Sequence, residues 1–215
     1  MNQTKGTTEQ RILDAAVQLF SRQGFSGTST REVARLADVN EASLFRHFPR
    51  KQDLFWAALQ SQLDHARPRK ELQEGLCQGG DPERVVPLIV ELLVHTAVYR
   101  FELVRLLYVG FLELRPGTER LYRQHLAPVF CAINDYLEHC VKTGTLRAVD
   151  HSITTVAFAT TVLARQGLYS LLADGGAPYS NADEAVEAYS KFWLSMLLPE
   201  SESDGSPQAL STSAI

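Results

Sequence analysis

The chain has 215 residues, of which 45% are hydrophobic and 21% are charged, so it can form a buried core and is not disordered as a whole. Its length allows one large domain or two small ones. The most apolar stretch, 85–114, is interrupted by Glu and Arg residues, so no segment reaches the ~18 uncharged apolar residues of a membrane helix. The chain starts without an apolar signal segment, and its three cysteines cannot form a disulfide framework. We therefore expect a cytoplasmic protein without contact to a membrane.

Charge is unevenly distributed along the chain. The 21 Lys and Arg residues against 25 Asp and Glu residues give a net charge of −4. Residues 1–52 contain 8 basic and 5 acidic residues, whereas the remainder contains 13 and 20. This asymmetry favours one module that contacts a polyanion and a second that does not, although an excess of this size also arises by chance.

Apolar residues recur at helical spacing, and no stretch alternates as a half-buried strand does. Three N-terminal helix starts have capping signals: Thr7 with Gln10, Ser29 with Glu32, and Asn40 alone. The spacing predicts an all-α fold of about nine helices, over about 7–24, 29–37, 41–47, 51–65, 82–99, 100–113, 118–142, 150–172 and 181–198.

Proline and glycine punctuate the later part of the chain. Residues 67–81 look like a connection with at most one helical turn. Pro87 predicts a kink or a later helix start, and Pro128 predicts a bend or a split in the helix that contains it. Residues 200–215 lack Lys and Arg and are rich in Ser, which predicts a disordered tail.

The segment 28–54 has the requirements of a helix-turn-helix. Ala34 is the small residue at which a second helix can cross closely, and Asp38-Val39 is placed at the turn. Leu44 supplies the apolar contact that fixes the second helix. The turn backbone is expected to be left-handed, and Asp is among the residues that adopt this conformation at low cost.

The same segment resembles the tetracycline-repressor (TetR-type) family of bacterial transcription regulators. The matching residues are Gly24-Phe25, Thr30-Arg31-Glu32-Val33-Ala34, Leu44-Phe45-Arg46-His47-Phe48 and Lys51-Gln52-Asp53-Leu54. The resemblance implies a three-helix DNA-binding domain over 1–50, a larger helical ligand-binding and dimerisation domain over 51–199, and the tail. Four residues depart from the family pattern: Phe45 replaces Tyr, Arg50 replaces Ser, Asp38 replaces Gly, and Glu41 stands where a basic or small residue is frequent.

The resemblance also implies the DNA contacts, and double-stranded operator DNA is the expected partner. It assigns contacts with the phosphate backbone of DNA to Thr28, Thr30, His47 and Lys51. Such contacts suit a helix N-terminus and a cationic side chain. Base reading is expected of Asn40, Glu41, Ala42, Ser43 and Arg46, with Phe45 packing beside them. Glu41 could equally complement the helix dipole, and Arg46 suits phosphate as well as guanine.

The C-terminal helices are expected to serve dimerisation and ligand binding. Small and large residues on the last two helices predict a four-helix homodimer interface with Ala157, Thr161, Ala164, Tyr189, Trp193 and Met196. The alternative for these residues is packing inside the chain. Residues in apolar context predict a pocket for an apolar or amphipathic small molecule, with His95, Tyr99, Tyr108, Phe130 and Arg165 as candidates, although such aromatic stripes are also ordinary core.

Catalytic motifs are absent: the chain has no glycine-rich phosphate loop, no G-x-S-x-G, no HExxH and no CxxC. Cys131, Asp135 and His139 share one helix face, but one face rarely completes a metal site, so we expect neither metal nor cofactor. The sequence thus predicts a homodimeric, DNA-binding repressor that is not an enzyme. The alternative is a helical small-molecule-binding or protein-interaction protein whose helix-turn-helix is vestigial.

Overall fold

A computed structural model describes residues 7–65, 68–172 and 181–199, and every regular element in these ranges is helical, which confirms the all-α prediction. The elements are α1 (Thr8–Gly27), α2 (Thr30–Leu36), α3 (Glu41–His47), α4 (Lys51–Asp64), α5 (Lys70–Gln78), α6 (Pro82–Tyr99), α7 (Phe101–Glu113), α8 (Arg115–Leu121), the π-helical turn η1 (Tyr122–Leu126), α9 (Ala127–Lys142), α10 (His151–Leu172) and α11 (Ala182–Leu197). The predicted tail, 200–215, lies outside the described residues.

Local capping explains where the N-terminal helices begin. The Thr7 hydroxyl accepts a hydrogen bond from the Gln10 N–H at 3.2 Å. Ser29 and Glu32 form a reciprocal capping box at the start of α2. The predicted caps are therefore present, and each satisfies N–H groups that have no partner within the helix.

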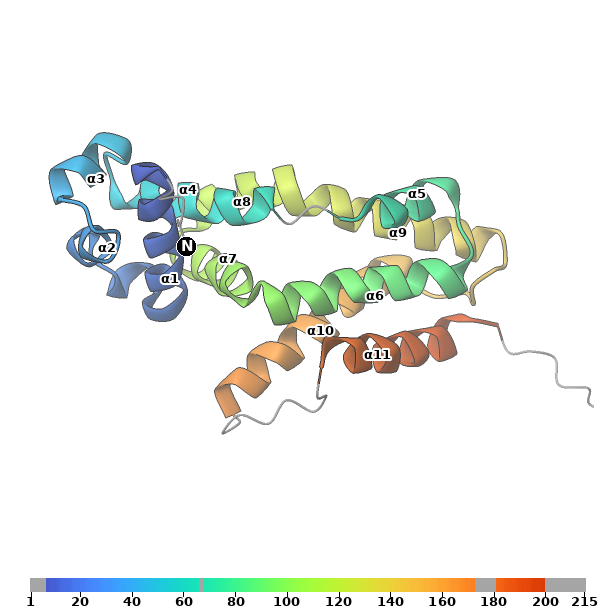
Figure 1. Cartoon of the computed structure of the whole chain (residues 1–215). Helices are drawn as coiled ribbons and strands as arrows, with labels where there is room; N and C mark the ends of the chain where they lie inside the picture. The colour runs from blue at the N-terminus through green and yellow to red at the C-terminus, as the bar shows by residue number, and fades with distance from the viewer. Residues whose placement is uncertain (1–6, 66–67, 173–180, 200–215) are drawn as a thin grey trace, which may run out of the picture.

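The helices form two apolar cores along an elongated molecule. Figure 1 shows α1–α3 at one end, and α10 and α11 together beneath α6. One core contains α1–α4 together with Leu103 and Leu106 of α7 and Leu121 of α8. The other contains buried side chains of α5, α6, α9, α10 and α11. Helix α7 is therefore packed directly against the end of the molecule that contains α1–α3.

The connection expected over 67–81 is instead largely helix α5, and this prediction was wrong for 70–78. Leu72 is buried against the second core, and Gly79 ends the helix in the left-handed conformation with φ 63°. Glycine at position 75 allows a close approach, because a Cβ there would lie 2.9 Å from the Val85 side chain. The glycines that suggested a loop are thus explained by close packing and by helix termination.

Proline acts differently in two of the helices. Pro87 lies inside α6, which starts at Pro82, so the later start that we considered does not occur. The predicted split near Pro128 is confirmed, because the stretch 118–142 is divided into α8, η1 and α9. Proline has no N–H to donate, and the π-helical turn before it absorbs the interruption. None of the described helices is long and apolar enough to cross a bilayer.

Candidate functional site

The turn between α2 and α3 has the geometry of a helix-turn-helix. Asp38 adopts φ 53°, the left-handed conformation expected at this position. Val33, Ala34 and Leu44 are buried at the contact between the two helices. The short α3 is therefore held by its apolar face and presents its other face to solvent.

The first turn of α3 exposes the side chains that were predicted to read bases. The Asn40 side chain caps the helix by accepting from the Ser43 N–H at 2.7 Å, and Glu41 and Ala42 are exposed. The Arg46 guanidinium donates to the Ser43 hydroxyl at 2.8 Å. This end therefore has an exposed polar surface, with the Arg46 side chain folded along the helix.

Most acidic groups of this end are engaged. The hydrogen bond from the Ser29 hydroxyl holds the pKa of Glu32 below its usual value. Asp38 lies 3.7 Å from Arg11, and Glu9 lies 4.0 Å from His47. The described exposed side chains of this end that carry positive charge include Arg31, Arg35 and Arg46, and sequence reasoning had passed over the first two.

Three residues predicted to contact the DNA backbone make contacts within the chain instead of being fully exposed. Thr28 is only 2% exposed and its hydroxyl donates to the Gly24 carbonyl, so the predicted DNA contact has no support from an exposed Thr28 hydroxyl. Thr30 is half-buried and its hydroxyl lies 3.5 Å from Glu41. Lys51 is half-buried, with its ammonium 4.4 Å from the centre of the Phe25 ring. The remaining predicted contact residues, Phe45, Arg46 and His47, are exposed.

A carboxylate at the end of α7 holds the end of α1. The backbone of Gly24 leaves the helical region with φ 77° and ψ 176°. Beyond this kink, the Glu113 carboxylate accepts from the Phe25 N–H at 3.1 Å, the Ser26 N–H at 2.8 Å and the Ser26 hydroxyl at 2.6 Å. Sequence reasoning missed Glu113, since nothing local links residues 88 positions apart.

These bonds predict a stability term with a defined pH dependence. The Ser26 hydroxyl, followed by backbone N–H groups, lowers the pKa of Glu113. A carboxylate whose pKa is lowered by folding stabilises the protein above its unfolded pKa, about 4.3, and this contribution is lost as the pH falls through the lower folded pKa. Because Glu113 is exposed, solvent weakens these bonds, and we expect Glu113→Ala to reduce the free energy of unfolding by about 1 kcal/mol at pH 7 and by less at pH 3, measured by urea titration.

The matched control for Glu113→Ala is Glu102→Ala, since Glu102 is an exposed acidic residue in the first turn of the same helix. We expect that variant to stay within about 0.5 kcal/mol of the wild type at both pH values. Equal effects of Glu113→Ala at pH 7 and pH 3 would contradict a role of the ionised carboxylate.

A large apolar cavity of about 610 Å³ lies among α4, α6, α7, η1 and α9. Tyr108 and Phe130, two of the predicted ligand residues, line this cavity. Its polar groups include His125, whose ring nitrogen lies 2.8 Å from the side-chain amide of Gln60. A volume of this size and an apolar lining suit a small organic molecule.

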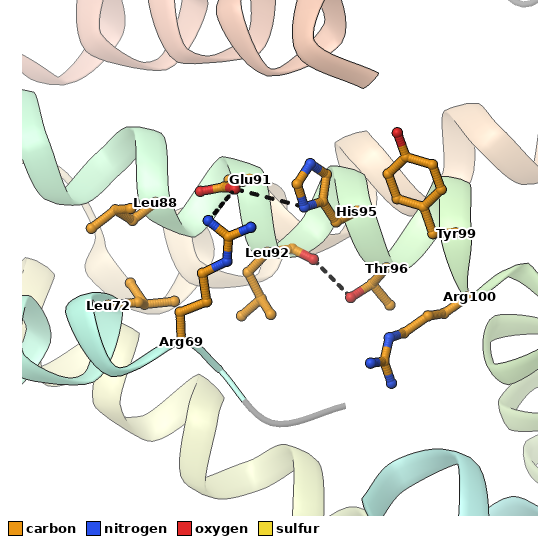
Figure 2. A pocket seen from close by; sticks show the side chains of 9 residues that line it. All are labelled: Arg69, Leu72, Leu88, Glu91, Leu92, His95, Thr96, Tyr99 and Arg100. Carbon is orange, nitrogen blue, oxygen red and sulfur yellow. Dashed lines mark hydrogen bonds and ion pairs between the residues drawn. The ribbon is translucent and has the colours of Figure 1, made fainter. Parts of the chain in front are cut away.

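The other predicted ligand residues lie elsewhere. His95 and Tyr99 line a second, smaller cavity of about 240 Å³ between α6 and the start of α5 (Figure 2). The five predicted ligand residues are therefore not brought together in one site. The side chain of Arg165 lies outside the described residues.

Both α10 and α11 carry exposed apolar side chains. The exposed fractions are 68% for Ile153, 57% for Val156, 50% for Phe192 and 54% for Met196. Thr161 and Ala164, two predicted interface residues, are also exposed, and Ala157 is half-buried.

Two other predicted interface residues face inward. Tyr189 and Trp193 are 9% and 8% exposed, and the Trp193 ring stacks on Phe158 at 4.2 Å between centroids. The chain's own core already covers these two side chains, so they offer little surface to a second subunit. The described residues contain no cluster of three or more His, Cys, Asp and Glu arranged to bind a metal ion.

Comparison with known proteins identifies similar chains. A family model described as "Bacterial regulatory proteins, tetR family" matches residues 12–58. The chain is 30% identical to the HTH-type transcriptional regulator AcrR of Shigella flexneri over 152 residues, which are 66% of this chain and 67% of AcrR. It is 29% identical to the HTH-type transcriptional repressor SCO4008 of Streptomyces coelicolor over 174 residues, 79% of this chain and 85% of that protein. Other curated relatives match over a shorter stretch, and the chain spans between 24% and 40% of their length.

The fold is similar to that of AibR in complex with isovaleryl coenzyme A and operator DNA. The TM-score is 0.67, with 18% sequence identity, over 86% of this chain and 97% of AibR. At this identity the likeness establishes the fold.

Proposed function

The chain belongs to the TetR family of DNA-binding transcriptional regulators, and we propose that it is a repressor whose homodimer is released from its operator by a small-molecule effector. The family is not enzymatic. One observation carries the proposal: α7 lines the large cavity with Tyr108 and also accepts hydrogen bonds from the end of α1 through Glu113. The protein would act in the cytoplasm, where bacterial DNA lies.

On operator DNA, the exposed first turn of α3 would enter the major groove. Glu41, Ala42 and Ser43 would lie nearest to base edges, where Ala suits a thymine methyl and Ser suits either base edge. Asn40 would add to this set, and Arg46 would leave Ser43 for guanine or phosphate. Thr30, His47 and Lys51 would contact the phosphate backbone and fix the position of α3, while Phe45 packs beside them.

A homodimer would present two such heads to a palindromic site. The exposed apolar side chains Ile153 and Val156 of α10 and Phe192 and Met196 of α11 support an interface at these two helices, since exposed apolar surface marks interaction sites. Two identical heads related by a two-fold axis match half-sites about one helical turn apart, or a multiple of that spacing.

An effector in the large cavity would act through α7. A ligand that prefers a different position of α7 shifts the population of head orientations, and operator affinity falls by the difference in ligand affinity between the two states. Coupling of this kind is typically about 1–3 kcal/mol, or roughly 5–150-fold. AibR, with isovaleryl coenzyme A and operator DNA in one crystal structure, supports an effector of small-molecule size.

A gel-shift experiment with DNA upstream of the protein's own gene tests the proposal, because such regulators frequently control neighbouring genes. Retarded DNA that unlabelled random DNA does not compete away supports an operator there. Absence of specific binding to that region and to random-sequence pools would favour the rival function, a helical protein with a vestigial helix-turn-helix.

Phosphate contacts predict a characteristic salt dependence. Each neutralised phosphate contributes about 0.9 to the slope of log affinity against log salt. We expect Lys51→Ala to weaken binding to operator and to unrelated DNA alike, and to flatten this slope by about one to two units per dimer, measured by fluorescence anisotropy. The matched control is Lys70→Ala on α5, far from the head in Figure 1, which should leave the slope unchanged. An unchanged slope for Lys51→Ala would remove Lys51 from the contact set.

A further inference from the structure

The smaller cavity contains two arginines, whereas the apolar cavity has the carboxylate of Asp64 and no Lys or Arg in its lining. The side chains of Arg69, Glu91, His95 and Arg100 line the smaller cavity together with leucines of α5 and α6 (Figure 2). Arg69 precedes α5, and Arg100 lies at the junction of α6 and α7. A pocket that combines apolar side chains with two guanidinium groups suits a ligand with an apolar part and a negative charge.

The charge balance of this cavity is positive. Glu91 is paired with Arg69 at 2.8 Å, and the Nδ1 atom of His95 lies 3.7 Å from the same carboxylate. No described residue forms a hydrogen bond or an ion pair with the Arg100 guanidinium, which Figure 2 shows extending away from Glu91. One arginine is therefore neutralised and one is available to an anion.

The two cavities meet on α6. Leu92 and Thr96 line both of them, and they lie one helical turn apart on the same face. Figure 2 shows Leu92 and Arg100 on the opposite side of α6 from the Tyr99 ring. An anion at Arg100 would therefore be adjacent to the apolar cavity of about 610 Å³.

We propose that the effector is an amphipathic anion, with its apolar chain in the large cavity and its carboxylate or phosphate at Arg100. The effector role of this anion rests on the proposed function, whereas its binding to the protein can be measured without DNA. Arg69 keeps Glu91 neutralised, so it contributes to the affinity even without contacting the anion. Glu91 opposes the ligand's charge, because its carboxylate lies in the same cavity.

Calorimetric titration of the full chain with a matched ligand series tests the proposal. The probes are decanoate, decyl phosphate, decanol and decyltrimethylammonium, which share a ten-carbon chain and differ in charge, with acetate and inorganic phosphate as head groups alone. We expect at least one of the two long-chain anions to bind at least tenfold more tightly than decanol, and the head groups alone to bind weakly. Whether decanoate or decyl phosphate binds more tightly distinguishes a carboxylate from a phosphate ligand.

Three variants separate charge recognition from folding. Arg100→Gln should remove the anion's advantage, about tenfold, and leave decanol affinity unchanged. Glu91→Gln should raise anion affinity several-fold, in the opposite direction to Arg100→Gln. A purely structural role of Glu91 would not raise the affinity. Arg84→Gln, at an exposed arginine of α6 outside the cavity, should change nothing.

The proposal is overturned if decanol or the cation binds as tightly as the anions, if no probe binds, or if Arg100→Gln weakens all probes equally. Anion binding that leaves operator affinity unchanged would keep this site and contradict the effector function instead. Specific operator binding without any anion binding would keep the regulator and contradict this site.

Discussion

Phe192→Asp is expected to convert the protein into a folded monomer of 24.0 kDa that binds operator DNA at least about 100-fold more weakly. The Phe192 side chain is 50% exposed on α11, so a carboxylate there costs the single chain little. In a dimer seam the same carboxylate would be buried without a partner, which costs several kcal/mol. Each monomer would then bind only one half-site of the operator, without the contacts of a second head. Sedimentation and anisotropy titration measure the two effects.

Leu112→Asp is the matched control for this substitution. Leu112 is 80% exposed on α7, so the change also replaces an exposed apolar side chain by a carboxylate, but on a helix that carries none of the predicted interface residues. We expect Leu112→Asp to remain dimeric. A Phe192→Asp protein that stays a tight dimer would place the interface elsewhere.

Trp193→Ala should lower the free energy of unfolding by about 3 kcal/mol, near the lower end of the range for a buried aromatic residue. The ring stacks on Phe158 and is 8% exposed, so its loss leaves a cavity in the second core. No described residue accepts a hydrogen bond from the indole Nε1, and loss of that unpaired group offsets part of the cost.

Trp193→Phe tests whether ring packing in the core accounts for the stabilising effect of Trp193. This variant keeps most of the stacking and removes the unpaired N–H, so it should cost less than about 1.5 kcal/mol. Urea titration at one fixed protein concentration is required, because the stability of a dimer depends on concentration. A Trp193→Ala variant of wild-type stability that is monomeric would return this residue to the interface.

The contrast between Phe192 and Trp193 shows what sequence patterns leave open. Adjacent aromatic residues on an amphipathic helix are both expected to be buried, but the pattern does not say whether the chain's own core or a second subunit covers them. In the structure, the ring of Trp193 packs inward while Phe192 remains half-exposed. The helices themselves were predictable because their starts and ends depend on local groups, such as Asn40 at α3 and Asp81-Pro82 at α6.

Contacts between distant segments were not predictable in the same way. Glu113 meets the kink at Gly24 only after α7 packs against α1. The predicted ligand residues His95 and Tyr108 share an apolar context in sequence, yet they line different cavities around α6 and α7. Helical periodicity locates a residue on a face of its own helix, whereas the neighbour of that face depends on the packing of the whole chain.

Selection of bound sequences from a random double-stranded DNA library by the purified full-length protein tests the central claim most directly. The account predicts enrichment of an inverted repeat whose half-sites are separated by about one helical turn or a multiple of it. Glu41→Ala should change the preferred bases within each half-site and keep the spacing. A library without any enriched sequence, or with one unrepeated half-site, would contradict a dimeric, sequence-reading regulator.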